Sequence, residues 1–184
     1  MSSVRKVPNL DGAIVISYGD PAYIGRHTLY PERSPVDQLE LIHRLVRADG
    51  WALSASSSSL AELLPLVVSV VGPNKRGRTA THRVGAWVRP DPPPTTEPTY
   101  AWEPVIFKAA RLPHLHTLDW LRASHKGARP GLVGAKPVAF YTWLLALLGW
   151  RNGDRLDEVF PGTSLLSDMV RQLALPLSVR KGAS

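Results

Sequence analysis

The stretch Ala13-Ile-Val-Ile-Ser-Tyr-Gly-Asp20-Pro-Ala-Tyr23 decides the fold class of this chain. Its first six residues form a short apolar and β-branched run, which is typical of a buried strand in a parallel sheet. Gly19-Asp20-Pro21 then ends the strand and begins a loop. Ligands of open α/β sheets bind beyond the carboxyl ends of the strands, so this loop is the first candidate for a functional site.

The next segment predicts a helix and a second strand. Ser34-Pro35 offers a capping hydroxyl followed by proline at the first helical position. Apolar residues recur at helical spacing from Val36 to Val46, and Gly50 ends the pattern. The run Trp51–Ala55 is the next expected strand, so strand, helix and strand form a βαβ unit with parallel strands.

The rest of the chain predicts further strands and helices, with no internal repeat and no change of composition that would mark a second domain. The expected strands are 83–88, 103–108 (antiparallel to its neighbour) and 154–159. The expected helices are 60–66, ending near Pro65, then 138–148, apolar nearly all round and ended by Gly149, and finally 165–173. We therefore predict a single α/β domain over 1–184 with flexible ends at 1–10 and 174–184. Its sheet is mixed and mostly parallel, with helices on both faces.

Composition limits the classes of protein to consider. The 184 residues carry a net charge of +7, which favours polyanionic partners such as nucleic acid, although many small basic proteins bind none. The chain has no cysteine, which excludes disulfides and cysteine–zinc sites, and its six histidines show no metal-ligand spacing. No apolar run reaches the roughly 18 residues of a membrane span, and Met1–Leu10 does not lead into a secretory signal, so we expect a cytoplasmic protein.

Three short motifs could carry chemistry. In Asp20-Pro21-Ala22-Tyr23 the carboxylate and a backbone carbonyl can accept hydrogen bonds from an exocyclic amino group, and the tyrosine can stack on a flat base. The segment Asp157–Ser164 ends a strand, turns through a glycine and begins a helix, so its backbone can approach a cofactor. Lys136-Pro137 stands at the start of the apolar helix. Taken singly, each motif is more often an ordinary turn or helix start.

Taken together and in this order, the motifs resemble those of the DNA amino-methyltransferases in which the catalytic tetrapeptide precedes the cofactor motifs. Their Asp-Pro-Pro-Tyr looks like Asp20-Pro-Ala-Tyr23, and Trp102-Glu103-Pro104 is similar to a segment of their later strands. Their Lys-Pro motif looks like Lys136-Pro137, and their glycine loop, Asp-x-Phe-x-Gly-x-Gly in outline, resembles Asp157 through Ser164. The resemblance covers roughly Asp11 to Val170. It is closest to small proteins found in bacteriophage genomes, for which the location would be the bacterial host cytoplasm.

The resemblance implies a Rossmann-like methyltransferase fold and methyl transfer from S-adenosylmethionine to an exocyclic amino group of a base in DNA. Tyrosine in the fourth position of the tetrapeptide favours adenine N6 over cytosine N4. The target base would be flipped out of the duplex. The catalytic residues implied are Asp20, Pro21 and Tyr23. The cofactor-binding residues implied are Lys136, Pro137, Asp157, Phe160, Gly162, Thr163 and Ser164. No metal is needed.

Two groups of cations are candidates for contact with DNA. The first group is Lys75, Arg76, Arg78 and Arg83, and the second is Arg122, Lys126 and Arg129. Both groups could equally be solvated surface loops. In so short a chain we expect no large target-recognition domain, so either sequence specificity is low or a homodimer or a partner subunit supplies recognition of the target. We expect both groups to flank one cleft. We also expect the strand 13–18 to lie beside the strand ending near Asp157, which puts Asp20 and Gly162 at one edge.

Three departures from the family pattern leave a second function open. Ala22 replaces the second proline of the tetrapeptide, and Ser164 replaces the last glycine of the cofactor loop. Leu173–Ser184 holds no acidic residue, whereas relatives have one that binds the cofactor ribose. We therefore expect weak cofactor binding, strengthened by Ser164→Gly. The alternative is a degenerate, catalytically weak or inactive relative that binds DNA or protein, and a third reading is a different small α/β enzyme acting on a nucleotide or RNA.

Overall fold

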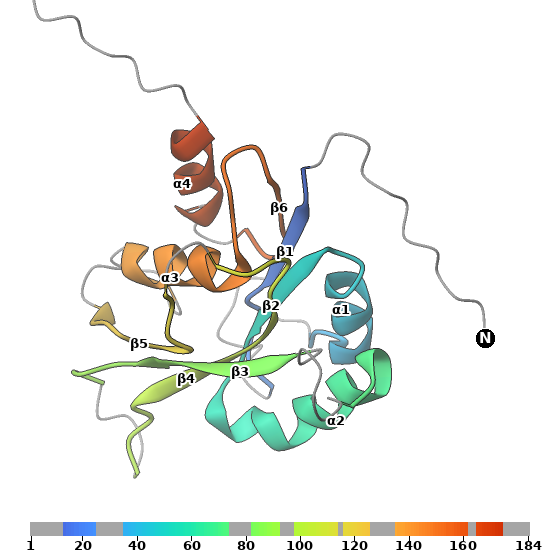
Figure 1. Cartoon of the computed structure of the whole chain (residues 1–184). Coiled ribbons are helices and arrows are strands. Elements are labelled where there is room, and N and C mark those ends of the chain that lie inside the picture. Colours follow the sequence, from blue (N-terminus) through green and yellow to red (C-terminus); the bar gives the residue numbers. More distant parts are fainter. Residues whose placement is uncertain are drawn as a thin grey trace, which may run out of the picture.

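A six-stranded mixed sheet runs through the part of the chain that the computed structural model describes (Figure 1). The described residues are 13–24, 35–73, 82–92, 98–113, 116–125, 135–161 and 165–174. In chain order the strands are β1 (Val15–Gly19), β2 (Gly50–Ser54), β3 (Arg83–Val88), β4 (Trp102–Lys108), β5 (Trp120–Arg122) and β6 (Arg155–Glu158). The helices are α1 (Gln38–Leu45), α2 (Leu60–Val71), α3 (Val138–Leu148) and α4 (Leu165–Ala174), with a short 3-10 turn, η2 (Ser57–Ser59), before α2.

The strand order is β5-β3-β4-β2-β1-β6. Strand β1 is parallel to both of its neighbours, β2 and β6, so β1, α1 and β2 form the predicted βαβ unit. Strand β4 is antiparallel to β2 and to β3, as predicted for 103–108, and β5 is parallel to β3. Ser17 lies opposite Asp157, which confirms that the first strand lies beside the strand ending near Asp157. Gly162 lies outside the described residues.

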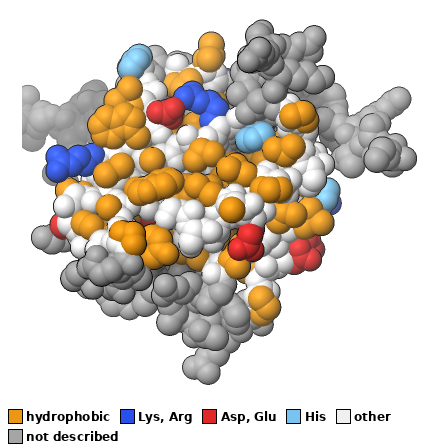
Figure 2. Space-filling model, turned by 90° about the horizontal axis from the view of Figure 1, so that it is seen from below, with side chains coloured by type: hydrophobic (Ala, Val, Ile, Leu, Met, Phe, Trp, Pro, Cys, Tyr) orange, Lys and Arg blue, Asp and Glu red, His pale blue; other side chains and the backbone are white. Residues whose placement is uncertain are grey.

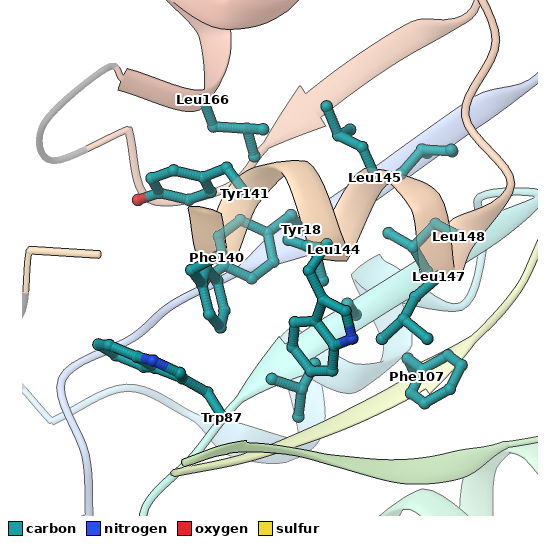
Figure 3. Close-up of a cluster of buried hydrophobic side chains, with 14 residues drawn as sticks. Tyr18, Trp87, Phe107, Phe140, Tyr141, Leu144, Leu145, Leu147, Leu148 and Leu166 are labelled. Carbon is teal, nitrogen blue, oxygen red and sulfur yellow. The ribbon is translucent and has the colours of Figure 1, made fainter. Parts of the chain in front are cut away.

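Helices cover both faces of the sheet (Figure 1). On one face α3 packs against Ile16 and Tyr18 of β1 and against Trp87 of β3, and Figure 3 shows Phe140 of α3 lying between Tyr18 and Trp87. On the other face α1 and α2 enclose a second cluster around Trp51. Full burial of one large apolar side chain contributes roughly 1.5–3 kcal/mol, so these two clusters are the main source of stability.

Helix α3 has the bounds that its sequence predicts. Seven of its residues are buried, among them Phe140, Tyr141 and Trp143, because the helix is apolar on nearly every side. It ends at Gly149, whose φ of 73° is left-handed. Leu166 of α4 is fully buried in the same cluster, so the last described helix packs against α3.

Two helices differ from their predicted bounds. Helix α1 begins at Gln38 and not at Ser34-Pro35, because Asp37 is the N-cap: its side chain accepts a hydrogen bond from the backbone N–H of Glu40 at 3.0 Å. Helix α2 continues through Pro65 to Val71 and does not end at the proline. Leu63 and Val67 are both buried on one side of α2, so the apolar pattern continues past Pro65, although this proline has no backbone N–H to donate.

Part of the sheet face opposite α3 is exposed. By strand register Val84, Trp102 and Trp120 lie on this face, and their exposed fractions are 38%, 38% and 48%. Figure 2, seen from below Figure 1, shows many apolar side chains and few charged ones on this side of the molecule. Among the described residues no helix is long and apolar enough to cross a membrane.

Candidate functional site

One edge of the sheet gathers several ionisable residues, among them Asp20 and Glu103, which the sequence singled out. Asp20 follows the carboxyl end of β1, and Glu158 ends the parallel neighbour β6. Because β4 runs in the opposite direction, its amino end reaches the same edge and places Glu103 opposite Trp87. Arg89 follows directly after β3. The topology therefore brings three carboxylates and one guanidinium to the edge at which open α/β sheets bind ligands.

Lys136 lies at the centre of this edge. It immediately precedes Pro137, the N-cap residue of α3, and it is 2% exposed. Its Nζ donates to both carboxylate oxygens of Asp20, at 3.0 Å to Oδ1 and 2.8 Å to Oδ2. The Oε2 atom of Glu103 lies 3.5 Å from the same nitrogen. A single buried ammonium group thus joins the start of α3 to the ends of β1 and β4.

Tyr23 and Arg89 complete the cluster through Glu103. The Tyr23 hydroxyl donates to Glu103 Oε2 at 2.6 Å, and Arg89 Nη1 lies 3.2 Å from Oε1. Lys136 Nζ also lies 5.7 Å from the centre of the Tyr23 ring, within range of a cation–π contact. We call Asp20, Tyr23, Arg89, Glu103 and Lys136 the edge cluster. It contains two cations, two carboxylates and one phenol.

Burial and charge set the protonation states of the edge cluster. Burial raises the pKa of Asp20, the nearby Lys136 opposes that change, and Glu103 adds to it. Burial alone would lower the pKa of Lys136, but the charge of Asp20, with Tyr23 and Glu103, outweighs burial and raises that pKa well above its usual range. The pKa of the Tyr23 phenol is also raised well above its usual range, mainly by burial. Lys136 therefore stays protonated and Tyr23 stays neutral, and Asp20 is the member of the cluster whose carboxyl group takes up a proton more readily than an ordinary aspartate.

A buried aromatic layer lies beneath the edge cluster. Lys136 Nζ is 5.9 Å from the centre of the Phe140 ring, and Phe140 contacts Tyr18 and Tyr141. The Tyr18 hydroxyl shares a 2.9 Å hydrogen bond with Ser54 Oγ at the end of β2, and both side chains are buried. This layer keeps water away from the inner side of the ammonium group, which strengthens its pairing with the carboxylates.

The residues predicted to bind a cofactor are only partly described. Pro137 is buried at the start of α3, and Phe160 packs at the edge of the cluster between the sheet, α1 and α2. The Asp157 carboxylate accepts a hydrogen bond from Ser17 Oγ at 3.1 Å and pairs with Arg44 at 3.0 Å. The remaining members, Gly162, Thr163 and Ser164, lie outside the described residues.

The prediction from sequence missed Glu158. In the pattern Asp-x-Phe-x-Gly-x-Gly the acidic residue stands two positions before the phenylalanine, and two positions before Phe160 is Glu158, whereas Asp157 is three positions before it. Glu158 accepts a hydrogen bond from Ser167 Oγ in α4. Burial raises the pKa of Glu158, the hydrogen bonds with Ser167 oppose that change, and the charge of Asp20 adds to it. Counting the spacing in the sequence would have identified it.

The two described members of the predicted DNA-binding groups, Arg83 and Arg122, lie at opposite ends of the strands. Arg83 begins β3, whereas Arg122 ends β5 beside Val88, at the carboxyl end of β3. Arg122 therefore lies at the edge that carries Asp20, and Arg83 lies at the opposite end of the strands, paired with Asp119. The expectation that both groups flank one cleft is wrong for these two residues, because β3 separates them by its full length. The other members, Lys75, Arg76, Arg78, Lys126 and Arg129, lie outside the described residues.

Among the described residues no group of three or more histidine, aspartate or glutamate side chains could hold a metal ion.

Comparison with known proteins identifies the class of fold. No protein-family model and no curated protein matches the chain. Among solved structures, the M1.HpyAVI–SAM complex is similar, with a TM-score of 0.56 and 14% sequence identity, covering 88% of this chain and 79% of that chain. M1.HpyAVI in a second crystal structure is similar at a TM-score of 0.55 and 12% identity, covering 88% and 77%. The chain therefore has the predicted fold, that of the Rossmann-like methyltransferases.

Replacement of the buried cation tests the charge balance of the edge cluster. Lys136→Met should lower the free energy of unfolding by about 3–5 kcal/mol at pH 7, because it leaves two half-buried carboxylates without their shared, buried partner. A carboxyl group whose pKa is raised by folding stabilises the folded state as the pH falls through that pKa, so the deficit should shrink between pH 7 and pH 5. Urea denaturation of the wild type and the variant at both pH values measures this difference in the free energy of unfolding.

The matched control is Arg171→Met, which removes an exposed cation paired with Asp168 on α4. The control should change the free energy of unfolding by no more than about 0.5 kcal/mol at either pH. An equal and pH-independent effect of the two substitutions would contradict the assigned charge states.

Proposed function

We propose that this chain transfers a methyl group from S-adenosylmethionine to an exocyclic amino group of a base in DNA, with adenine N6 as the target. The observation that carries the proposal is the position of Asp20. Its carboxylate follows β1 at the ligand-binding edge of a methyltransferase-type sheet, next to β6, and is held there by Lys136. M1.HpyAVI, which has a similar fold, has been crystallised with SAM.

The described residues at this edge suit a cationic cofactor. S-adenosylmethionine carries a sulfonium charge, and Glu158 supplies a carboxylate at the end of β6, beside β1. The charge of Lys136 does not oppose this, because Asp20 and Glu103 neutralise it. Pro137, Asp157, Phe160, Gly162, Thr163 and Ser164 would line the cofactor, and we add Glu158 to that set.

Asp20 and the Pro21 carbonyl would act on the target amine. The cofactor supplies an electrophilic methyl group. Each hydrogen of the amine would donate to one of the two acceptors, so that the nitrogen lone pair faces the methyl carbon. When the nitrogen–carbon bond forms, the carbon–sulfur bond breaks and its electron pair stays on sulfur. The nitrogen then carries a positive charge and must lose one proton, which Asp20 would take and pass to water.

Lys136 would be a positioning residue for Asp20 in this scheme. Its raised pKa keeps the ammonium group charged, so it cannot accept the proton from the amine. The Nζ atom bonds to both oxygens of Asp20 and fixes the plane of the carboxylate. Each carboxylate oxygen has two lone pairs, so Asp20 can bond to Lys136 and still accept a hydrogen bond from a base. Tyr23, beside it, would stack on the flipped base.

Removal of Asp20 tests the mechanism. Asp20→Ala and Asp20→Asn should lower methyl incorporation into unmethylated genomic DNA by about 10²–10⁴-fold, the range of a lost acid–base group. Calorimetric titration should give a cofactor dissociation constant within about threefold of the wild-type value, since Asp20 serves the target amine. Glu62→Gln, which removes an exposed carboxylate on α2, is the control and should leave both values unchanged.

The outcomes separate the candidate functions. Full activity in Asp20→Ala would remove the mechanism. If neither the wild type nor Ser164→Gly binds the cofactor, the chain is the degenerate relative, for which Ala22 and Ser164 are the motivating features.

The two described arginines predicted to bind DNA form a matched pair. Arg122 lies at the edge that carries Asp20, and Arg83 lies at the other end of the strands. Arg122→Ala should weaken binding to duplex DNA and reduce the slope of log K against log salt concentration by about 0.9, the value for one lost phosphate contact. Arg83→Ala should change neither quantity. Fluorescence anisotropy at several salt concentrations measures both, and a larger effect of Arg83→Ala would show that DNA lies elsewhere.

A further inference from the structure

We infer that Glu103 is a positioning residue that fixes the ring of Tyr23 for stacking on the target base. The inference rests on the proposed function and extends it to the Trp102-Glu103-Pro104 motif, to which the mechanism above assigns no role. It depends on where β4 places Glu103, on the contacts of its two oxygens, and on the loop in which Tyr23 lies.

Strand β4 directs Glu103 toward the edge cluster. Side chains alternate along a strand, and Val105 and Phe107 of β4 are buried in the cluster beneath α3. Glu103 shares their face, whereas Trp102 and Pro104 point to the opposite face. The carboxylate is therefore delivered to the α3 side by the register of a central strand, and its side chain is only 14% exposed.

The contacts of Glu103 occupy both oxygens. Oε1 faces Arg89 at 3.2 Å, which sets the rotamer of the carboxylate. Oε2 accepts the Tyr23 hydroxyl at 2.6 Å and lies 3.5 Å from Lys136 Nζ. A hydrogen bond from a neutral phenol to an ionised carboxylate is short and about twice as strong as one between neutral groups. Arg89 and Lys136 therefore fix the position of the Glu103 carboxylate. This carboxylate in turn accepts the hydrogen bond from the Tyr23 hydroxyl.

Tyr23 needs such an anchor because its backbone is irregular. It lies after the end of β1 in the described segment 20–24, outside any helix or strand. Ala22 stands where the related tetrapeptide has a second proline, so the backbone before Tyr23 has one fewer fixed φ angle. The hydroxyl bond to Glu103 and the ammonium of Lys136 over the ring fix the side chain from two directions. Glu103 thus supplies by a hydrogen bond the rigidity that the missing proline would give.

The first measurement detects the anchor without any activity. In protein labelled with ¹³C-tyrosine, the Tyr23 Cζ signal is the one of five that disappears in Tyr23→Phe. It should move upfield in Glu103→Gln, because the phenol then donates to a neutral acceptor. The same signal should stay in place in the control Glu62→Gln. An unchanged Tyr23 signal in Glu103→Gln would overturn the inference, whatever the activity of the chain.

The second measurement is a double-mutant cycle on methyl transfer. Glu103→Gln and Tyr23→Phe should each lower kcat by about tenfold or more through a displaced base, with an unchanged dissociation constant for S-adenosylmethionine. If Glu103 acts through Tyr23, the double variant should be no more than about threefold slower than the slower single variant. If the decrease in kcat of the double variant equals the product of the two single decreases, Glu103 acts independently of Tyr23.

The outcome for the wild type separates this inference from the proposed function. If Glu103→Gln shifts the Tyr23 signal but the wild-type chain transfers no methyl group to DNA, the proposed function is removed, and with it the role of Glu103 in base stacking. A wild-type chain that is active while Glu103→Gln keeps full kcat would leave the proposed function in place and overturn the inference.

Discussion

The arrangement of the site depends on one buried ammonium group. Lys136 Nζ is held by Asp20 and Glu103, from segments 116 and 33 residues away in the chain. An unpaired buried charge costs several kcal/mol, so the start of α3, the end of β1 and the amino end of β4 must meet for the chain to fold. The same pairing that satisfies the lysine also fixes the carboxylate proposed to face the target amine. Stability and the geometry of the site are therefore linked through this residue.

The charge balance of the edge cluster also divides the chemical roles. Two cations and two carboxylates neutralise one another, so a further cationic group could approach without a net repulsion. Lys136 stays protonated and Tyr23 stays neutral, so only Asp20 is suited to take a proton. Glu103 is committed to Tyr23 and Arg89. A cluster of five polar side chains thus contains one proposed proton acceptor, one stacking ring and three residues that hold them in place.

Strong local patterns allowed the elements around the site to be predicted from the sequence. The apolar run before Asp20 and the all-apolar helix 138–148 are set by residues adjacent in the chain. The predicted start of α1 was wrong because Asp37, which competes with Ser34 as a cap, is the N-cap residue. The predicted end of α2 was wrong because the buried face of the helix continues past Pro65. The pairing of Lys136 with Glu103 has no local signal, since it depends on an antiparallel strand inserted beside β2. Glu158 did have a signal, in the spacing to Phe160.

We propose that this edge of the sheet transfers a methyl group to an amino nitrogen of DNA. Mass spectrometry tests it most directly, on nucleosides from unmethylated DNA incubated with the wild-type chain and S-adenosylmethionine carrying a deuterated methyl group. The account predicts labelled N6-methyl-2′-deoxyadenosine, formed by the wild type and lost in Asp20→Asn. No labelled nucleoside, or a label found only on carbon as 5-methyl-2′-deoxycytidine, would contradict it.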